Sequence, residues 1–532
     1  MADRLLPAVF GFSGGYATDL PTQSRSLDYW LKAENVIFTV SGIARKVGGA
    51  NKVNATTITD SPDVTGMFDF WRNGAAASFT QKHVVVTANG KVYKDDMDGT
   101  YDDITGAATI TADAIPVFCQ ARDLLLIFTD KNDTPLKWNQ TGNVASLGGS
   151  PPSGRGAVFH NNRVWTWGDN SNPSRLTYGS STTAEDFTGV DTGGIDIDPE
   201  DGDRIVGAIS HKEILFIFKG PNTGSIHMIA GTAPTGGDAY SRKVLVRGIA
   251  LQTHNSIIPV GDDVFFMSER GIHSLRATQQ FGNFSEADVT RYLKGYFRDN
   301  LNRAQLNKVW GVNYADKGCM LWLVPLAGST ECNAVFGLSY IRSAEEGPKA
   351  FTWTRAGTSA GIRIHPTTKA RELVFGTTDG FVTIQDYVNR SIYSNTAYQM
   401  TMRSPQILMG GADGGGRQRP DQPITIERIY MRSVSTGNHN VSMLVSRLTP
   451  EGQTESETYT FNQGESLFVL GTSQLNVGTL GGDSVPIIYS TPSAFGSARA
   501  VQFEITQGGL NQDAQLLEFG VEYTPQSQAN TY

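Results

Sequence analysis

Short apolar runs bounded by turn-forming residues recur along the first 390 residues of the chain. Pairs of these runs flank a short turn, as in HVVVTANGKVYK from His83 and DVFFMSERGIHSLRA from Asp263. The runs are rich in β-branched and aromatic residues, and the turns contain Gly, Asn or Asp, which is typical of β-hairpins. Helical periodicity is almost absent. The pattern therefore predicts an all-β protein.

The hairpins repeat at a fairly regular interval, with successive starts 39 to 56 residues apart. The starts are His83, Asp123, Asn162, Glu213, Asp263, Cys319 and Glu372. A propeller blade of four strands takes ~40–50 residues. We therefore expect residues 61–395 to form a β-propeller of about six or seven blades, with a sandwich or a meander barrel as the alternatives.

The pattern changes on both sides of this region. Residues 396–423 include a Gly-rich stretch and predict a flexible connection. Residues 424–532 show the alternation of half-buried antiparallel strands and predict a separate C-terminal β-sandwich. Residues 1–60 predict an arm whose strands, at Val36–Val40 and Ile43–Val47, either close the propeller or reach a neighbouring chain.

One segment, from Ser285 to Lys308, has a helical pattern. Ser285 is suited to cap the N-terminus, with Glu286 and Asp288 in the first turn. Val289, Leu293, Phe297, Leu301 and Leu306 form a broken apolar stripe. We expect one helix packed on the outside of the sheets.

Composition narrows the class of protein. Charged residues are only 18% of the chain and the net charge is −8, so no general attraction to nucleic acid or anionic lipid is expected. Three cysteines are too few for a disulfide framework and predict buried free thiols in a reducing compartment. No signal peptide and no run of 18 apolar residues is present, so we expect a protein without a membrane-spanning segment, made in a cytoplasm.

The densest charge cluster runs from Glu185 to Asp203. Its last part resembles a calcium loop, but the EF-hand pattern requires Gly at its sixth position, which is Asp201, and Glu at its twelfth, which is Gly207. The spacing favours a solvated acidic loop over a metal site. Its carboxylates are Asp196, Asp198, Glu200, Asp201 and Asp203.

The sequence offers no support for catalysis. The eight histidines are scattered without metal-ligand spacing, and a lone histidine beside a strand, such as His227 or His273, is expected to be structural. Arg163, Trp165 and Trp167 could suggest base stacking, but single-strand sites also need a positively charged groove, so core tryptophans are favoured. We expect no enzyme activity, cofactor or metal.

The order of segments resembles the tail nozzle proteins (tail tubular protein B, or tail stabilisation proteins) of short-tailed bacteriophages and their prophage relatives. The resemblance covers roughly residues 30–390. It is carried by the segments ENVIFTVSGIARKVGG, FHNNRVWTWGDNSNPSRLTYGSSTTAEDF, DGDRIVGAISHKEILFIFKGPNTGSIHMIAG, GIALQTHNSIIPVGDDVFFMSERGIHSLRA and NYADKGCMLWLVP. It is a matter of pattern, without a single diagnostic motif.

The resemblance implies a structural virion protein of the phage tail. Such proteins form a ring, usually a homohexamer, below the head-to-tail adaptor, where they extend and gate the DNA-ejection channel. The implied partners are other copies of the chain, the adaptor ring, tail fibre or plug proteins, and double-stranded DNA that passes without specific binding. Because negative walls repel phosphates, we expect some carboxylates of the acidic cluster to face the channel.

Two other functions remain open at the level of sequence. A receptor- or carbohydrate-binding tail or baseplate propeller would expose aromatic side chains at its loops, with Trp138, Trp165 and Trp353 as candidates. A glycosidase built on a propeller would need paired carboxylates in the central cavity.

Overall fold

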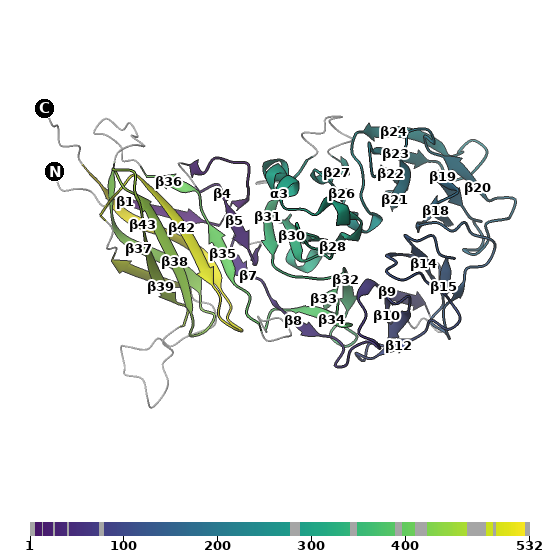
Figure 1. Ribbon diagram of the computed structural model, residues 1–532, viewed down its shortest axis with the longest axis horizontal. Coiled ribbons are helices and arrows are strands. Elements are labelled where there is room, and N and C mark those ends of the chain that lie inside the picture. Colours follow the sequence, from purple (N-terminus) through teal and green to yellow (C-terminus); the bar gives the residue numbers. More distant parts are fainter. Residues whose placement is uncertain are drawn as a thin grey trace.

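In the computed structural model, the chain folds into a β-propeller and a β-sandwich that lie side by side (Figure 1). The all-β fold class is thereby confirmed. The structure describes residues 6–12, 14–24, 27–39, 42–73, 79–276, 288–340, 348–388, 396–409, 423–464, 486–492 and 496–526.

Seven sheets of described residues surround the centre of the propeller, one for each blade. Blades 1 and 2 comprise β9 (Val64–Asn73), β10 (Phe79–Thr87), β11 (Val92–Asp95), β12 (Tyr101–Asp103), and β13 (Pro116–Ala121), β14 (Leu124–Thr129), β15 (Leu136–Trp138), β16 (Ala145–Ser146). Blades 3 and 4 comprise β17 (Gly156–His160), β18 (Arg163–Asp169), β19 (Asn172–Tyr178), β20 (Gly193–Asp196), and β21 (Arg204–His211), β22 (Ile214–Gly220), β23 (Ser225–Ala230), β24 (Ser241–Arg247). Blades 5 to 7 comprise β25 (Ile258–Val260), β26 (Asp263–Ser268), β27 (Gly271–Ser274), then β28 (Trp310–Tyr314), β29 (Cys319–Val324), β30 (Ala334–Ser339), β31 (Lys349–Trp353), then β32 (Ser359–Ile364), β33 (Arg371–Gly376), β34 (Val382–Asp386).

Each hairpin predicted from the sequence forms the second and third strands of a blade. The turns behave as their residues suggest: Gly90 and Gly380 adopt φ angles of +74° and +75°, in the left-handed region that favours glycine. The predicted interval between hairpins is therefore the length of one blade. The first strand of each blade had no comparable signal in the sequence.

An N-terminal strand closes the ring. β8 (Gly49–Lys52) pairs antiparallel with β34 and becomes the outermost strand of blade 7. Just before it, a Cβ on Gly48 would lie 2.3 Å from the carbonyl oxygen of Asp386, so glycine allows the close approach. The strand that closes the propeller and protects the edge of the last blade is therefore β8. The two strands predicted for this function, at Val36–Val40 and Ile43–Val47, belong instead to a sheet of the sandwich.

The sandwich consists of two sheets that share an aromatic core. One sheet holds β1 (Leu6–Gly11), β6 (Val36–Phe38), β7 (Ala44–Lys46), β37 (Ile424–Val434), β40 (Pro486–Pro492), β41 (Ser497–Ala498) and β43 (Gln515–Pro525). The other holds β3 (Gln23–Ser24), β5 (Lys32–Glu34), β35 (Met400–Arg403), β36 (Gln406–Leu408), β38 (Asn440–Leu448), β39 (Thr454–Asn462) and β42 (Ala500–Gln507). Phe10, Phe503 and Phe519 pack between them with ring centroids 5.1 to 5.6 Å apart.

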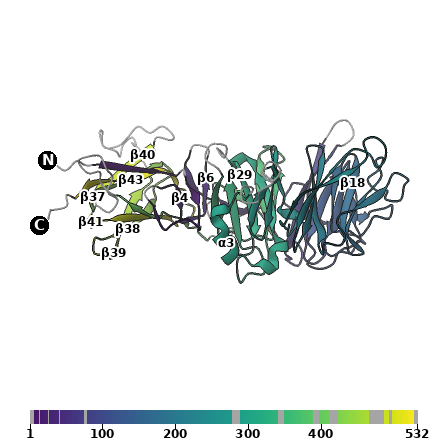
Figure 2. The ribbon, with the colours of Figure 1, turned by 90° about the horizontal axis from the view of Figure 1, so that it is seen from above.

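The sandwich differs from its predicted boundaries in two respects. The expected connection at residues 396–423 already contains β35 and β36, and residues 410–422 lie outside the described residues. The N-terminal segment also supplies strands to both bodies rather than forming a free arm. β5 pairs with β31 of blade 6 on one side and with β35 on the other, so a single sheet of 11 strands runs from the propeller into the sandwich. Viewed from above, the strands around β6 lie between the sandwich and blade 6 (Figure 2).

The predicted helix is much shorter than expected. Its described part consists of η3 (Arg291–Leu293), α3 (Lys294–Asp299) and η4 (Arg303–Lys308), and Ser285 and Glu286 lie outside the described residues. The helix stops because Leu301 forms a β-bridge with Leu326 and Asn302 caps the next turn through the backbone N–H of Ala304. The apolar stripe still packs against blades 5 and 6. The remaining short elements are β2 (Gly15–Tyr16), β4 (Tyr29–Trp30), η2 (His254–Ser256) and η5 (Ala315–Lys317).

Candidate functional site

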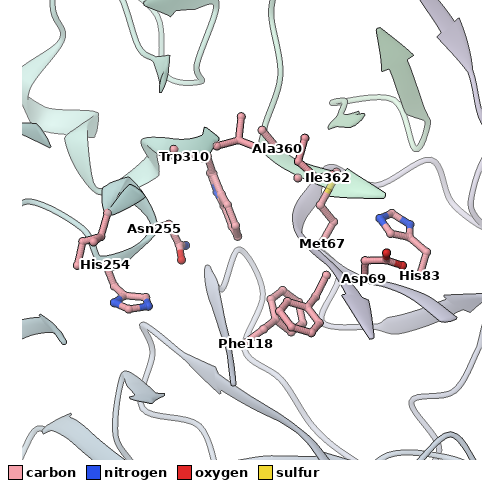
Figure 3. Close-up of a pocket in the computed structure, with 14 residues that line it drawn as sticks. Met67, Asp69, His83, Phe118, His254, Asn255, Trp310, Ala360 and Ile362 are labelled. Carbon is pink, nitrogen blue, oxygen red and sulfur yellow. The ribbon is translucent and has the colours of Figure 1, made fainter. Parts of the chain in front are cut away.

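The centre of the propeller holds a cavity of about 320 Å³. Its walls come mainly from the first strands of blades 1, 2, 6 and 7, namely β9, β13, β28 and β32, with His83 of β10 and residues of η2. Figure 3 shows Phe118 and Trp310 approaching the cavity from opposite sides. The ring of Phe118 stacks on that of Phe68 at 5.5 Å between centroids. These aromatic side chains therefore take up part of the central space of the propeller.

Two ionisable residues stand side by side on one wall of the cavity. Asp69 and His83 are opposite each other in the pairing of β9 with β10. Burial raises the pKa of Asp69, although its carboxylate accepts hydrogen bonds from Gln81 Nε2 (2.9 Å) and Trp71 Nε1 (3.1 Å). Burial, followed by the charge of Arg363, lowers the pKa of His83 to about 3. Both side chains are therefore parts of a fixed polar network.

The cavity has one carboxylate, Asp69, among its described lining residues. Glycoside hydrolysis usually employs a pair of carboxyl groups flanking the scissile bond. The described wall therefore does not supply the pair that the glycosidase alternative requires.

The acidic cluster predicted from the sequence lies between blades 3 and 4, where it links β20 to β21. Asp198 bridges to the outer strand of blade 4, with its carboxylate 2.8 Å from Nη2 of Arg247 and also paired with Arg242. These contacts, the hydrogen bond from Arg242 first, lower the pKa of Asp198 to about 2. Asp198 thus joins two elements of the chain.

Two further carboxylates of the cluster, Asp201 and Asp203, accept hydrogen bonds from Lys219 and from the turn that follows β22. Lys219, whose side chain has no exposed surface, donates to Asp201 Oδ1 (2.6 Å) and to the carbonyl oxygens of Ile197 (2.8 Å) and Asp198 (2.7 Å). The buried carboxylate of Asp203 accepts backbone N–H groups at 2.7 to 3.0 Å, from Asn222, Thr223 and Gly224. The expected solvated acidic loop is therefore largely a clamp between blades.

The five predicted carboxylates thus separate into two groups. Asp198, Asp201 and Asp203 are partly or wholly buried and have partners within the chain, and the burial of Asp203 is incompatible with a place on a channel wall. Asp196 and Glu200 are exposed, with Asp196 paired at 3.1 Å to Arg175. Their orientation toward a channel stays a prediction.

The aromatic residues suggested for ligand binding are in the core. Trp138, Trp165 and Trp353 are at most 2% exposed, and each indole N–H donates to a carbonyl oxygen. They offer no surface for a sugar, so these three candidates were wrong. The interpretation of Trp165 and Trp167 as core residues is confirmed.

The expected structural roles of lone polar residues also hold. His227 and His273 are buried, and each Nε2 contacts a serine hydroxyl, that of Ser225 (2.8 Å) or Ser268 (2.9 Å). The three cysteines are buried free thiols, as predicted.

Sequence reasoning missed the seam between the two bodies. Asn35 is buried with φ of +55° and donates through Nδ2 to Thr354 Oγ1 and to the carbonyl of Gln399, both at 2.8 Å. Inside the sandwich, the fully buried Lys46 of β7 donates from Nζ to Gln507 Oε1 of β42 (2.6 Å) and so joins its two sheets. An isolated Asn followed by a strand gives no sign of such contacts, because their partners lie more than 300 residues away in sequence.

Within the described parts of the chain, no three metal-ligating side chains come together, and no helix has both the length and the apolar character to cross a membrane. No family model and no curated protein matches the chain. Among solved structures, the chain is similar to the β-propeller domain of Cps50 (Swd1) from Myceliophteria thermophila, with 11% sequence identity and a TM-score of 0.37. That match covers 63% of this chain and 98% of the propeller domain.

Proposed function

We propose that this β-propeller protein is a structural subunit of the tail nozzle of a short-tailed bacteriophage. In this function, six copies form a ring below the head-to-tail adaptor, and the ring extends and gates the DNA-ejection channel. The chain would be made in the host cytoplasm and reside in the tail of the virion. Its further partners would be the adaptor ring, fibre or plug proteins, and DNA in transit.

The observation that carries the proposal is the construction of the seam. The segment ENVIFTVSGIARKVGG, which begins the resemblance to nozzle proteins, supplies Asn35, β6, β7 and Lys46. It lies between the two bodies and bonds to both. The resulting continuous sheet suits a subunit whose function is mechanical, because paired strands join one body to the other.

The central cavity helps to locate the conduit in this proposal. A cavity of about 320 Å³, lined by Phe118 and Trp310 among others, has no room for a duplex. DNA would instead pass along the axis of the ring, outside each propeller. The blade bodies would then form the wall of the ring.

Mass measurement of the purified chain, alone and after mixing with the cognate adaptor ring, tests the proposal. We expect complexes that contain six copies of the chain for each adaptor ring. A chain that stays monomeric at all concentrations and does not bind the adaptor would overturn the proposal.

The exposed carboxylates give a test of the conduit. The double variant D196K/E200K should raise the affinity of the assembled ring for duplex DNA and make that affinity fall more steeply with salt, because added cations release counterions from phosphates. D98K/E213K, in blades 1 and 4, is the control for total charge. Equal DNA affinity in the two variants would contradict a channel-facing position for Asp196 and Glu200.

A further inference from the structure

A second hollow, of about 620 Å³, lies where the loops of blades 4 and 5 meet α3. We call it the basic cleft, after the cations Arg270, Lys294, Arg298 and Arg303 that line it. Figure 1 shows α3 next to β26 and β27, which end at this cleft. The cleft is separate from the central cavity and from the acidic cluster.

The charge of the basic cleft is opposite to that of the whole chain. Its described lining has four cations and two carboxylates, Glu269 and Asp288, in a protein of net charge −8. Asp288 is buried, and its Oδ1 accepts both the N–H and the hydroxyl of Thr290 at 2.9 Å. Its charge is therefore already partly compensated, which leaves the cleft attractive to anions.

Two of the cations, Lys294 and Arg298, lie on the helix α3, which is packed against the core. Lys294 and Arg298 are four residues apart on α3 and share one face of it, while the neighbouring Tyr296 and Phe297 anchor the helix in the core. The backbone N–H of Gly295 donates to both carboxylate oxygens of Asp19, at 3.0 and 3.1 Å. The backbone positions of Lys294 and Arg298 are therefore fixed before a ligand binds, although their side chains are exposed.

Most of these cations are not held in strong ion pairs by described residues, so they are free to contact a ligand. Among the described residues, Lys294 and Arg303 have no ion-pair partner at 4.0 Å or less, and both are exposed. Arg298 pairs with its neighbour Asp299, but both side chains are more than half exposed, and pairs of this kind are weak. Arg270 is 3.7 Å from Glu269 and is also exposed.

We propose that the basic cleft binds a small organic phosphate, with Lys294 and Arg303 on the phosphate oxygens and Arg298 exchanging its carboxylate for the ligand. Lysine and arginine donors fit phosphate oxygens, with arginine able to bind two at once. The volume exceeds that of a phosphate group, and Ile249 and Ala250 provide apolar wall for the remainder of the molecule. This site is independent of the nozzle function.

Calorimetric titration of the full chain with inorganic pyrophosphate, the phosphate part alone, tests this inference. We expect saturable binding that the triple variant K294Q/R298Q/R303Q weakens by roughly tenfold or more. The control variant K131Q/K243Q/R371Q removes the same charge from exposed positions elsewhere and should bind as the wild type does. A titration with ADP should show tighter binding than pyrophosphate, because Ile249 and Ala250 line the space for the rest of the molecule. Binding of ADP no tighter than that of pyrophosphate would contradict a site for an organic phosphate.

The outcome that overturns the inference is the absence of saturable binding, or equal loss of binding in the triple variant and its control. Melting temperature and circular dichroism of both variants exclude unfolding as the cause. If the triple variant does not fold, the single variants K294Q and R303Q serve, since each changes an exposed side chain. The ring-assembly measurement has no bearing on this result.

Discussion

Asn35 links the propeller to the sandwich through hydrogen bonds of its side chain. Its backbone takes a left-handed conformation that asparagine tolerates better than most residues. Its side chain donates to Thr354 and Gln399, while its Oδ1 accepts the backbone N–H of Thr354 at 2.8 Å. This position therefore requires a residue that tolerates a left-handed backbone and whose side chain both donates and accepts hydrogen bonds.

Replacing Asn35 by alanine should lower the free energy of unfolding by about 3 kcal/mol, since it strains the backbone and leaves buried partners unpaired. Denaturant unfolding followed by circular dichroism measures this change. N172A, at an exposed position of β19, is the control and should alter stability by less than about 0.5 kcal/mol. A similar effect of both substitutions would contradict the function assigned to Asn35.

His83 predicts how stability depends on pH. In the folded chain its pKa is about 3, whereas an unfolded histidine titrates near 6.5. Below pH 6.5 the unfolded chain therefore binds a proton that the folded chain does not, so stability falls as the pH decreases from 6.5 toward 3.

The H83Q variant removes this titration and retains a side chain that can bond to the hydroxyl of Tyr101, which lies 2.8 Å from His83 Nδ1. Between pH 7 and pH 5, the wild type should lose about 2 kcal/mol more unfolding free energy than H83Q. Urea titrations at the two pH values measure the difference. Equal losses of unfolding free energy in the wild type and H83Q would show that His83 binds its proton equally well in the folded and unfolded chains.

Residue-level features were predictable where local chemistry determines them. Gly90 and Gly380 mark turns, and the three cysteines and Trp167 were placed in the core correctly. The partners of Asn35 and Lys46 were not predictable, because hydrogen bonds between distant segments leave no local pattern in a single sequence. The same limit explains why Trp138 was suggested as a surface residue.

At the level of elements, the acidic cluster is a clamp between blades 3 and 4. A buried lysine is stable only with partners for its charge and its donors, and Lys219 has Asp201 together with two carbonyl oxygens. The sequence indicated the cluster but not this function, because Lys219 lies in an ordinary-looking strand. The helix was overestimated for a similar reason, since the β-bridge at Leu301 is a tertiary contact.

The variant K219M should destabilise the protein by about 3–5 kcal/mol, because it leaves Asp201 and two buried carbonyl groups without their partner. R175Q, which breaks the exposed pair with Asp196, should cost less than about 1 kcal/mol. Chemical denaturation of the two variants provides the comparison. Equal costs would show that the clamp adds no more than a surface ion pair does.

At the level of the whole molecule, two architectures share one continuous sheet. The repeat of hairpins was sufficient to predict the propeller, and alternation was sufficient to predict strands in the C-terminal region. The union of the two bodies was not predictable, because β1 and β5 pair with strands from much later in the chain. This union joins the two bodies through paired strands, a construction that suits the nozzle proposal.

Electron microscopy of the purified chain mixed with its adaptor ring tests the nozzle proposal most directly. We expect six-fold rings on the adaptor, with the propellers in the wall and an open axis wide enough for duplex DNA. Particles that remain single propeller–sandwich units beside unoccupied adaptor rings would contradict it.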